Sequence, residues 1–166
     1  MQKSRANING VTLVETLLYV AIFGVMIVAF TTFSKSLVSN RMQSQSLFEV
    51  NDQGEAVLKT ITQTLRNADQ VNSPSAGNTT DSLSVDTASS GTSPTIFSVV
   101  DGVLNIKEGG GEVIPLTNSK VVVSDLVITN LSRPDTVNAV KVSFKLTSAT
   151  NSNYFVTFQG SGGPRK

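Results

Sequence analysis

The sequence predicts an α+β fold in which one long amino-terminal helix precedes an antiparallel β-sheet. An uninterrupted apolar run occupies residues 11–33, and apolar residues then keep a helical spacing, with no proline before Pro74. From residue 95 onward, short β-branched segments alternate with glycine-containing turns. We therefore expect the first half of the helix to span a membrane and the second half to pack on the sheet. The 166 residues suit one domain plus a membrane segment.

The composition excludes several classes of chemistry. The chain has no Cys, His or Trp, which removes thiol and imidazole catalysis, the usual zinc ligand sets and any disulfide framework. Its formal charge is +1, and without Lys3 and Arg5 the count becomes 11 basic against 12 acidic residues. The overall charge is therefore not basic enough to indicate that the protein binds nucleic acid.

Catalytic and cofactor motifs are also missing from the sequence. The acidic residues are scattered, without the spacing of a calcium-binding loop, and no Gly-Lys-Ser/Thr follows the three glycines at 109–111. We therefore expect no enzyme activity, catalytic residue, cofactor or metal. Four lysines could form a basic patch on the sheet, but no aromatic platform lies among them, so we infer no nucleic-acid binding; they are Lys107, Lys120, Lys141 and Lys145.

The first ten residues are short, polar and basic, and the apolar segment that follows has 23 residues and ends at Phe33. A secretory signal would have an apolar region of about 7 to 15 residues and a small-residue cleavage site. A signal anchor fits the length better, because about 20 apolar residues span a bilayer, and Lys3 and Arg5 favour a cytoplasmic amino end. An anchor alone does not explain Glu15.

Glu15 carries the only charge in the apolar segment. A carboxylate costs roughly 2.5 to 3.5 kcal/mol at the bilayer centre, and less near an end, so a partner is expected. One interpretation is local: Thr12 and Glu15 have the spacing of a capping box, and the helix dipole favours an anion in the first turn. A second interpretation is that another subunit supplies the partner.

Gly10 is followed by Val11-Thr12-Leu13-Val14-Glu15 and then Thr16-Leu17-Leu18-Tyr19-Val20-Ala21-Ile22. This stretch resembles the amino terminus of type IV pilins and the related pseudopilins. The resemblance implies that residues 1–10 are a leader, that a prepilin peptidase cuts after Gly10 on the cytoplasmic side, and that the new amino terminus on Val11 is methylated. Val11 departs from the phenylalanine most common there, which favours a minor subunit over a major one.

The resemblance also implies a partner for Glu15, namely the α-amino group of Val11 on an adjacent subunit. A charge pair at about 4 Å, with an effective dielectric constant near 20, contributes about 4 kcal/mol. That is enough to offset the cost of the carboxylate. The pair would set the register of each incoming helix during assembly.

The second half of the helix is expected over residues 34–71. At 1.5 Å per residue the whole helix would be on the order of 90 Å long, so we expect its first half to project from the globular part. Gly24 and Gly54 weaken the helix locally by up to about 1 kcal/mol each. The part of the helix from Leu47 to Ala68 is predicted to carry the sheet-facing stripe. The apolar residues that keep the helical spacing are Leu37, Leu47, Val50, Val57, Leu58, Ile61, Leu65 and Ala68.

Residues 72–94 are rich in Ser, Thr, Asn, Gly and Pro and predict a surface loop, with room for a short strand at Leu83 and Val85. An N-glycosylation pattern begins at Asn78. Residues 95–160 predict the antiparallel sheet, and residues 161–166 a frayed tail.

Within the sheet, Asp101-Gly102 predicts a two-residue hairpin, and residues 108–111 a second reversal. Residues 120–129 are nearly continuously β-branched, which predicts a strand covered on both faces. By contrast, the strand around residues 140–146 alternates and should have one wet face. Its inward-facing side chains would be Val140, Val142, Phe144 and Leu146.

A weaker resemblance points to minor pseudopilins of type II secretion and competence systems. It consists of Leu65-Arg66-Asn67-Ala68, Asp101-Gly102-Val103-Leu104, Pro115-Leu116-Thr117 and the strand over residues 121–128. Three functions remain: a subunit of a type IV pilus-like filament, a pseudopilin of a secretion or DNA-uptake system, or a membrane-anchored binding domain that does not polymerise.

The first two functions imply the same partners: the prepilin peptidase, other pilin or pseudopilin subunits, an assembly platform protein and the membrane. They also imply the same route. The subunit would reside in the cytoplasmic membrane with its amino end inside, and then in an extracellular pilus or a pseudopilus.

Overall fold

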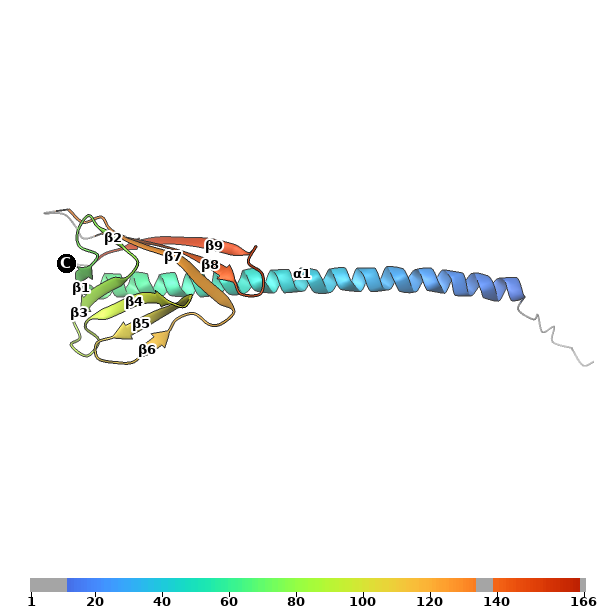
Figure 1. Cartoon of the computed structure of the whole chain (residues 1–166), viewed down its shortest axis with the longest axis horizontal. Helices are drawn as coiled ribbons and strands as arrows, with labels where there is room; N and C mark the ends of the chain where they lie inside the picture. Colours follow the sequence, from blue (N-terminus) through green and yellow to red (C-terminus); the bar gives the residue numbers. More distant parts are fainter. Residues whose placement is uncertain (1–11, 134–138, 165–166) are drawn as a thin grey trace, which may run out of the picture. The chain divides into compact units, whose positions relative to one another are not determined.

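The computed structural model describes residues 12–133 and 139–164, and in them it contains one helix, α1 (Leu13–Asn67), followed by antiparallel strands (Figure 1). The predicted α+β class is confirmed. The chain divides into two compact units, Met1–Gln43 and Ser44–Lys166. The strands are β1 (Ala68–Ser73), β2 (Thr79–Thr80), β3 (Leu83–Thr87), β4 (Thr95–Val100), β5 (Val103–Glu108), β6 (Val113–Pro115), β7 (Val121–Asn130), β8 (Val140–Ser148) and β9 (Phe155–Gly162).

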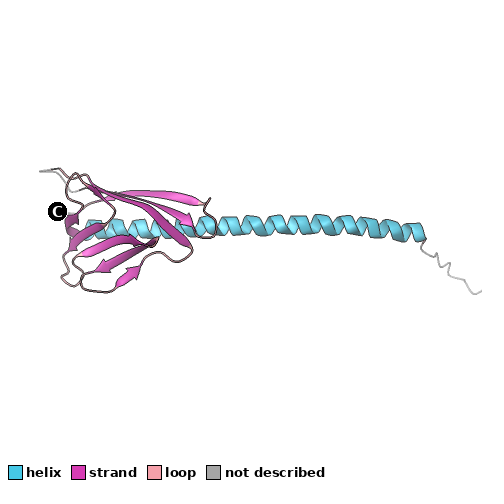
Figure 2. Cartoon of the chain, viewed as in Figure 1, coloured by secondary structure: helices cyan, strands magenta, loops and turns pink. Residues whose placement is uncertain are grey.

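The strands of the second unit form two antiparallel sheets rather than the single one expected. The first sheet has the order β1-β3-β4-β5-β6, and the second has the order β2-β7-β8-β9. Figure 2 shows these strands gathered along the carboxyl-terminal part of α1. The chain crosses from one sheet to the other three times, because β2 lies between β1 and β3 in the sequence but pairs with β7, and the chain enters the second sheet again after β6.

The core of this unit lies between the helix and the two sheets. The helix contributes a stripe at the spacing of one face, as predicted, and each sheet contributes the inward side chains of its strands. The fully buried large side chains include Val50, Val57, Ile61 and Leu65 of α1, Leu83, Val85, Phe97 and Leu104 of the first sheet, and Ile128, Val140, Phe144 and Leu146 of the second.

The helix ends at Asn67, four residues before the predicted end at residue 71. Ala68 continues the helical spacing of buried residues, but it is buried as the first residue of β1. From there Val71 pairs with Val85 of β3, so the ladder to a distant strand replaces the next helical turn.

The predicted surface loop over residues 72–94 requires a correction. Leu83 and Val85 are fully buried in β3, which is a central strand of the first sheet. Elsewhere in this segment, Thr79 and Thr80 form β2, and the side-chain amide of Asn130 donates to the carbonyl of Pro74 at 2.7 Å. The short strand allowed for at Leu83 and Val85 is therefore present, but the Ser- and Thr-rich composition did not indicate its central place in the sheet, because only its inward residues are apolar.

The hairpin at Asp101-Gly102 is confirmed by the pairing of Val100 with Val103. Both turn residues have positive φ, 52° and 76°, as a type I′ turn requires. Gly102 also approaches β7: its carbonyl accepts from the amide of Val123 at 2.8 Å, and a Cβ there would lie 2.8 Å from a methyl carbon of Val122.

Two predictions about the second sheet have opposite outcomes. β8 alternates as expected, with Val140, Val142, Phe144 and Leu146 buried. β7 was expected to be covered on both faces, and this is wrong, since Val122 and Val127 are exposed. A one-sided sheet accepts β-branched residues on its outer face for their strand propensity alone.

The predicted tail is also partly corrected. Ser161 and Gly162 extend β9, where they pair with Lys141 and Val140, and Pro164 is buried. Residues 165 and 166 lie outside the described residues.

Candidate functional site

The first unit contains an apolar helical surface that no other described residue covers. The most apolar stretch of 18 residues has a mean hydropathy of 2.4, and none of these residues is buried. By length and composition the helix can therefore cross a membrane. The exposed large side chains are Leu13, Val14, Leu17, Leu18, Tyr19, Val20, Ile22, Phe23, Val25, Met26, Ile27, Val28, Phe30 and Phe33.

Thr12 caps the start of α1. Its side-chain oxygen accepts from the backbone amide of Glu15 at 3.3 Å, and its carbonyl accepts from the amide of Thr16 at 3.1 Å. This is the N-cap geometry, in which one of the unpaired amides of the first turn finds a side-chain acceptor. Thr12 therefore performs its half of the predicted capping box.

The carboxylate of Glu15 binds in the other direction along the helix. Its Oε1 atom accepts from the hydroxyl of Tyr19 at 3.0 Å, one turn further on. Both side chains are exposed in the unit. The sequence reasoning did not single out Tyr19, although a glutamate and a hydroxyl donor four residues apart on a helix are neighbours.

Gly10 and Val11 lie outside the described residues. The predicted cleavage after Gly10, the methylation of Val11 and the pairing of its amine with Glu15 therefore stay predictions. What the structure contributes is the immediate surroundings of Glu15, which contain Thr12 and Tyr19.

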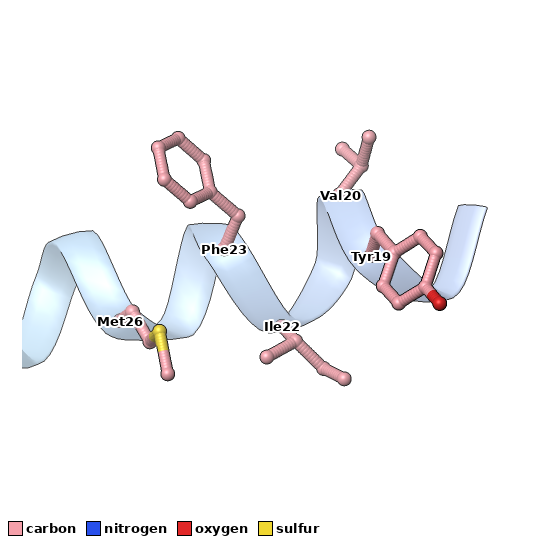
Figure 3. Close-up of a pocket in the computed structure, with 5 residues that line it drawn as sticks. All are labelled: Tyr19, Val20, Ile22, Phe23 and Met26. Atoms are coloured by element: carbon pink, nitrogen blue, oxygen red, sulfur yellow. The ribbon is translucent and has the colours of Figure 1, made fainter. Parts of the chain in front are cut away.

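Figure 3 shows a shallow apolar recess on the same helix, lined by Tyr19, Val20, Ile22, Phe23 and Met26. All five side chains come from one helix and project outward from it. Such a surface suits lipid tails or a neighbouring helix better than a small molecule, which usually binds in a concave site with a few placed polar groups. Within residues 12–133 and 139–164, no group of three or more His, Cys, Asp or Glu residues is placed to hold a metal ion.

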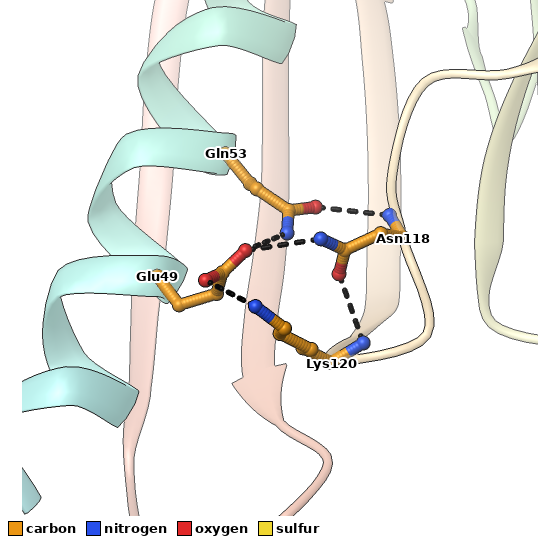
Figure 4. Close-up of polar contacts among 4 residues, drawn as sticks. All are labelled: Glu49, Gln53, Asn118 and Lys120. Carbon is orange, nitrogen blue, oxygen red and sulfur yellow. Dashed lines mark hydrogen bonds and ion pairs between the residues drawn. The ribbon is translucent and has the colours of Figure 1, made fainter.

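A second polar cluster lies in the other unit, where α1 faces the loop before β7 (Figure 4). Glu49 accepts from the side chains of Gln53 at 2.6 Å, Asn118 at 3.0 Å and Lys120 at 3.2 Å. Gln53 in turn accepts from the backbone amide of Asn118 at 3.0 Å. The cluster attaches the loop to the helix.

The hydrogen bonds to Asn118, Gln53 and Lys120 hold the pKa of Glu49 below its ordinary value, because each donor favours the charged carboxylate. The spacing of Glu49 and Gln53 on one helix face was visible in the sequence. Their partners are 65 and more residues away, so no local pattern could have indicated them.

The four lysines considered for a basic patch are divided among different parts of the unit. Lys120 pairs with Glu49, and Lys107 belongs to β5 of the first sheet. Lys141 and Lys145 share the outer side of β8, where the ammonium of Lys145 lies 4.2 Å from the ring centroid of Phe155. Only this last pair of lysines shares a strand.

Comparison with protein-family models, with curated proteins and with solved structures gave no match to this chain.

Proposed function

We propose that this chain is a structural subunit of a type IV pilus-like filament. In this proposal the chain is inserted in the cytoplasmic membrane as a precursor, cleaved after Gly10 and assembled through the amino-terminal part of α1. The observation that carries the proposal is Glu15, the one charged residue in an exposed apolar helical segment of membrane-spanning length.

The physical argument begins with the apolar surface. A bilayer covers the side chains of residues 13–33 before assembly, and neighbouring helices cover them afterwards. The charge of Glu15 is energetically unfavourable both in the bilayer and among neighbouring helices, unless a positively charged group pairs with it. The α-amino group created by cleavage at Val11 of another copy is such a partner, contributing about 4 kcal/mol at 4 Å with an effective dielectric constant near 20.

Helix capping does not remove the need for that partner. Thr12 supplies the cap through its own side chain, and the Glu15 carboxylate is directed to Tyr19. The Glu15 carboxylate is therefore not used in capping the helix, and it can bind a partner on another subunit. The prepilin peptidase, an assembly platform protein and other subunits are the partners in this proposal, and a pseudopilus of a secretion or DNA-uptake system would use the same steps.

Processing is tested by mass spectrometry of the amino terminus of the protein from its native membrane. We expect a chain that begins at methylated Val11. The Gly10→Val variant should remain a full-length membrane precursor, because a bulky side chain replaces glycine at the cleavage site. Retention of residues 1–10 in the wild type would instead support an anchored domain that does not polymerise.

Assembly is tested by Glu15→Gln, which can still accept a hydrogen bond but carries no charge. We expect unchanged expression, membrane insertion and helix content, with loss of the subunit from sheared surface fibres after normalisation to the membrane pool. An uncompensated amine in a low-dielectric bundle costs several kcal/mol. Thr12→Val is the matched control for capping, and it should lower helix stability at the amino end without abolishing incorporation. Incorporation of the Gln variant at the wild-type level would refute the charge-pair mechanism.

A further inference from the structure

We propose that Tyr19 is a positioning residue for Glu15: its hydroxyl holds the carboxylate in one conformation before assembly and leaves the second oxygen for the incoming amine. This inference rests on the proposed function, because the amine belongs to another copy of the chain. The carrying observation is the 3.0 Å hydrogen bond from the Tyr19 hydroxyl to Oε1 of Glu15.

The direction of the contact follows from helix geometry. Long side chains on a helix lean toward its amino end, so a tyrosine reaches back over the turn that precedes it. Tyr19 lies one turn after Glu15, which puts its hydroxyl beside the carboxylate while the ring stays in the apolar surface. In Figure 3 the ring lies among the side chains that line the recess, with the oxygen at its tip.

The bond leaves the carboxylate able to accept a second partner. An ionised carboxylate has two oxygens and about four lone-pair sites, and Tyr19 occupies one site on Oε1. No other described residue donates to this carboxylate, so with respect to residues 12–133 and 139–164 its Oε2 atom can accept from an ammonium. Glutamate otherwise has considerable rotamer freedom, so fixing its side chain in advance reduces the entropy lost when the pair forms.

Tyr19 has a competing explanation as an aromatic residue of the membrane interface, where tyrosine rings are common. In that case its hydroxyl would act on lipid headgroups or water, and its effect would not depend on Glu15. The two explanations are separated by combining changes at both positions.

The first experiment measures incorporation into sheared fibres, normalised to the membrane pool, for full-length chains in the native cell. Tyr19→Phe removes only the hydroxyl, and we expect incorporation to fall about two- to tenfold. Tyr154→Phe, the same change at the other tyrosine of the chain, is the matched control and should have no effect.

A double-mutant cycle then tests whether Tyr19 acts through the carboxylate. Glu15→Asp keeps the charge but withdraws it by up to about 1.5 Å, beyond hydrogen-bond reach of the Tyr19 hydroxyl. In this background Tyr19→Phe should cause no further loss. An equal loss from Tyr19→Phe in both backgrounds would assign the residue to the membrane interface and overturn the inference.

The second experiment does not depend on filaments. In the Tyr154→Phe variant, reconstituted in vesicles, the Raman Fermi doublet of the remaining tyrosine reports whether its hydroxyl donates a strong hydrogen bond. We expect the donor signature with Glu15 and its loss with Glu15→Ala. A doublet that Glu15→Ala leaves unchanged overturns the inference whatever the fibres show.

The two proposals also fail in different ways. If Glu15→Gln abolishes incorporation and Tyr19→Phe leaves it at the wild-type level, the positioning role is wrong and the charge pair stands. If Glu15→Gln incorporates normally, the charge pair is refuted, and the role of Tyr19 in assembly is refuted with it.

Discussion

At the scale of one residue, helix propensity and core packing favour different side chains at Gly54. In sequence terms a glycine inside a helix only weakens it. In the structure a Cβ at Gly54 would lie 2.1 Å from two ring atoms of Phe158 of β9. Phe158 is itself buried and stacked on Phe144, with ring centroids 5.5 Å apart. The missing side chain therefore makes room for a ring that cannot easily move.

This contact predicts that Gly54→Ala destabilises the protein, although alanine is the better helix former by about 1 kcal/mol. Overpacking a dense core costs about 1 to 3 kcal/mol, and the loss of the Phe144–Phe158 stacking adds to it. The measurement is chemical unfolding of the chain in detergent, monitored by circular dichroism.

Gly110→Ala is the control for this substitution, because a Cβ there would meet nothing within 4 Å. It should leave the unfolding midpoint nearly unchanged. A stabilised Gly54→Ala variant would mean that helix propensity outweighs the contact and that Phe158 can move aside.

At the scale of elements, the Glu49 cluster attaches the loop before β7 to α1. Glu49 and Gln53 project from successive turns of the helix, and Asn118 donates to both, from its side-chain amide to Glu49 and from its backbone amide to Gln53 (Figure 4). The side chain of Lys120 is 68% exposed, so its ion pair with Glu49 is screened by water and salt. The hydrogen bonds from Asn118 and Gln53 should therefore dominate.

The lowered pKa of Glu49 predicts a pH-dependent contribution to stability. The charged carboxylate is favoured more in the folded than in the unfolded chain, so the contribution is present above the ordinary pKa of 4.5 and is lost as pH falls through the lower folded value. Glu49→Gln should thus be less stable than wild type at pH 7, and the difference should shrink below about pH 4.5. Unfolding midpoints measured across this range test the sign.

Asn118→Ala offers a companion test, because Asn118 is the largest cause of the lowered pKa. It should reduce the same pH dependence, whereas Asn72→Ala, at an exposed position of β1, should retain it. If the Glu49→Gln difference is constant from pH 7 to pH 3, the cluster does not hold the charged form of Glu49.

At the scale of the whole molecule, the chain separates into a unit with an uncovered apolar surface and a unit with its own core. All the buried hydrophobic residues that form the core fall between Val50 and Phe158, inside the unit Ser44–Lys166. The unit that precedes it presents exposed apolar side chains on its described residues. Solubility and folding should therefore depend on different parts of the sequence.

We predict that residues 40–166 form a folded, monomeric, detergent-free domain. The truncation removes the apolar segment and keeps the helix residues that bury Val50, Val57, Ile61 and Leu65. Circular dichroism and size-exclusion chromatography give the test. A second truncation to residues 60–166 is the matched control, and it should unfold, since each lost valine removes about 1.5 to 3 kcal/mol of burial. A requirement for detergent by residues 40–166 would show that its core is incomplete.

The sequence alone determined the features whose cause is local. Helix capping at Thr12, the apolar segment, the turn at Asp101-Gly102 and the alternation of β8 each follow from the chemistry or spacing of residues close together in the chain. Even the contact of Glu15 with Tyr19 was readable in principle, because the two residues are one helical turn apart.

Only the tertiary structure decided where distant segments meet. The helix ends at Asn67 because β1 pairs with β3, and Leu83 is buried because β3 pairs with both β1 and β4. The loop partners of Glu49, such as Asn118, and the Phe158 ring beside Gly54 likewise come from segments far away in the sequence. These pairings form when the free energy of burial and hydrogen bonding exceeds the entropy of closing long loops. That balance depends on the whole fold, so no local window of the sequence contains it.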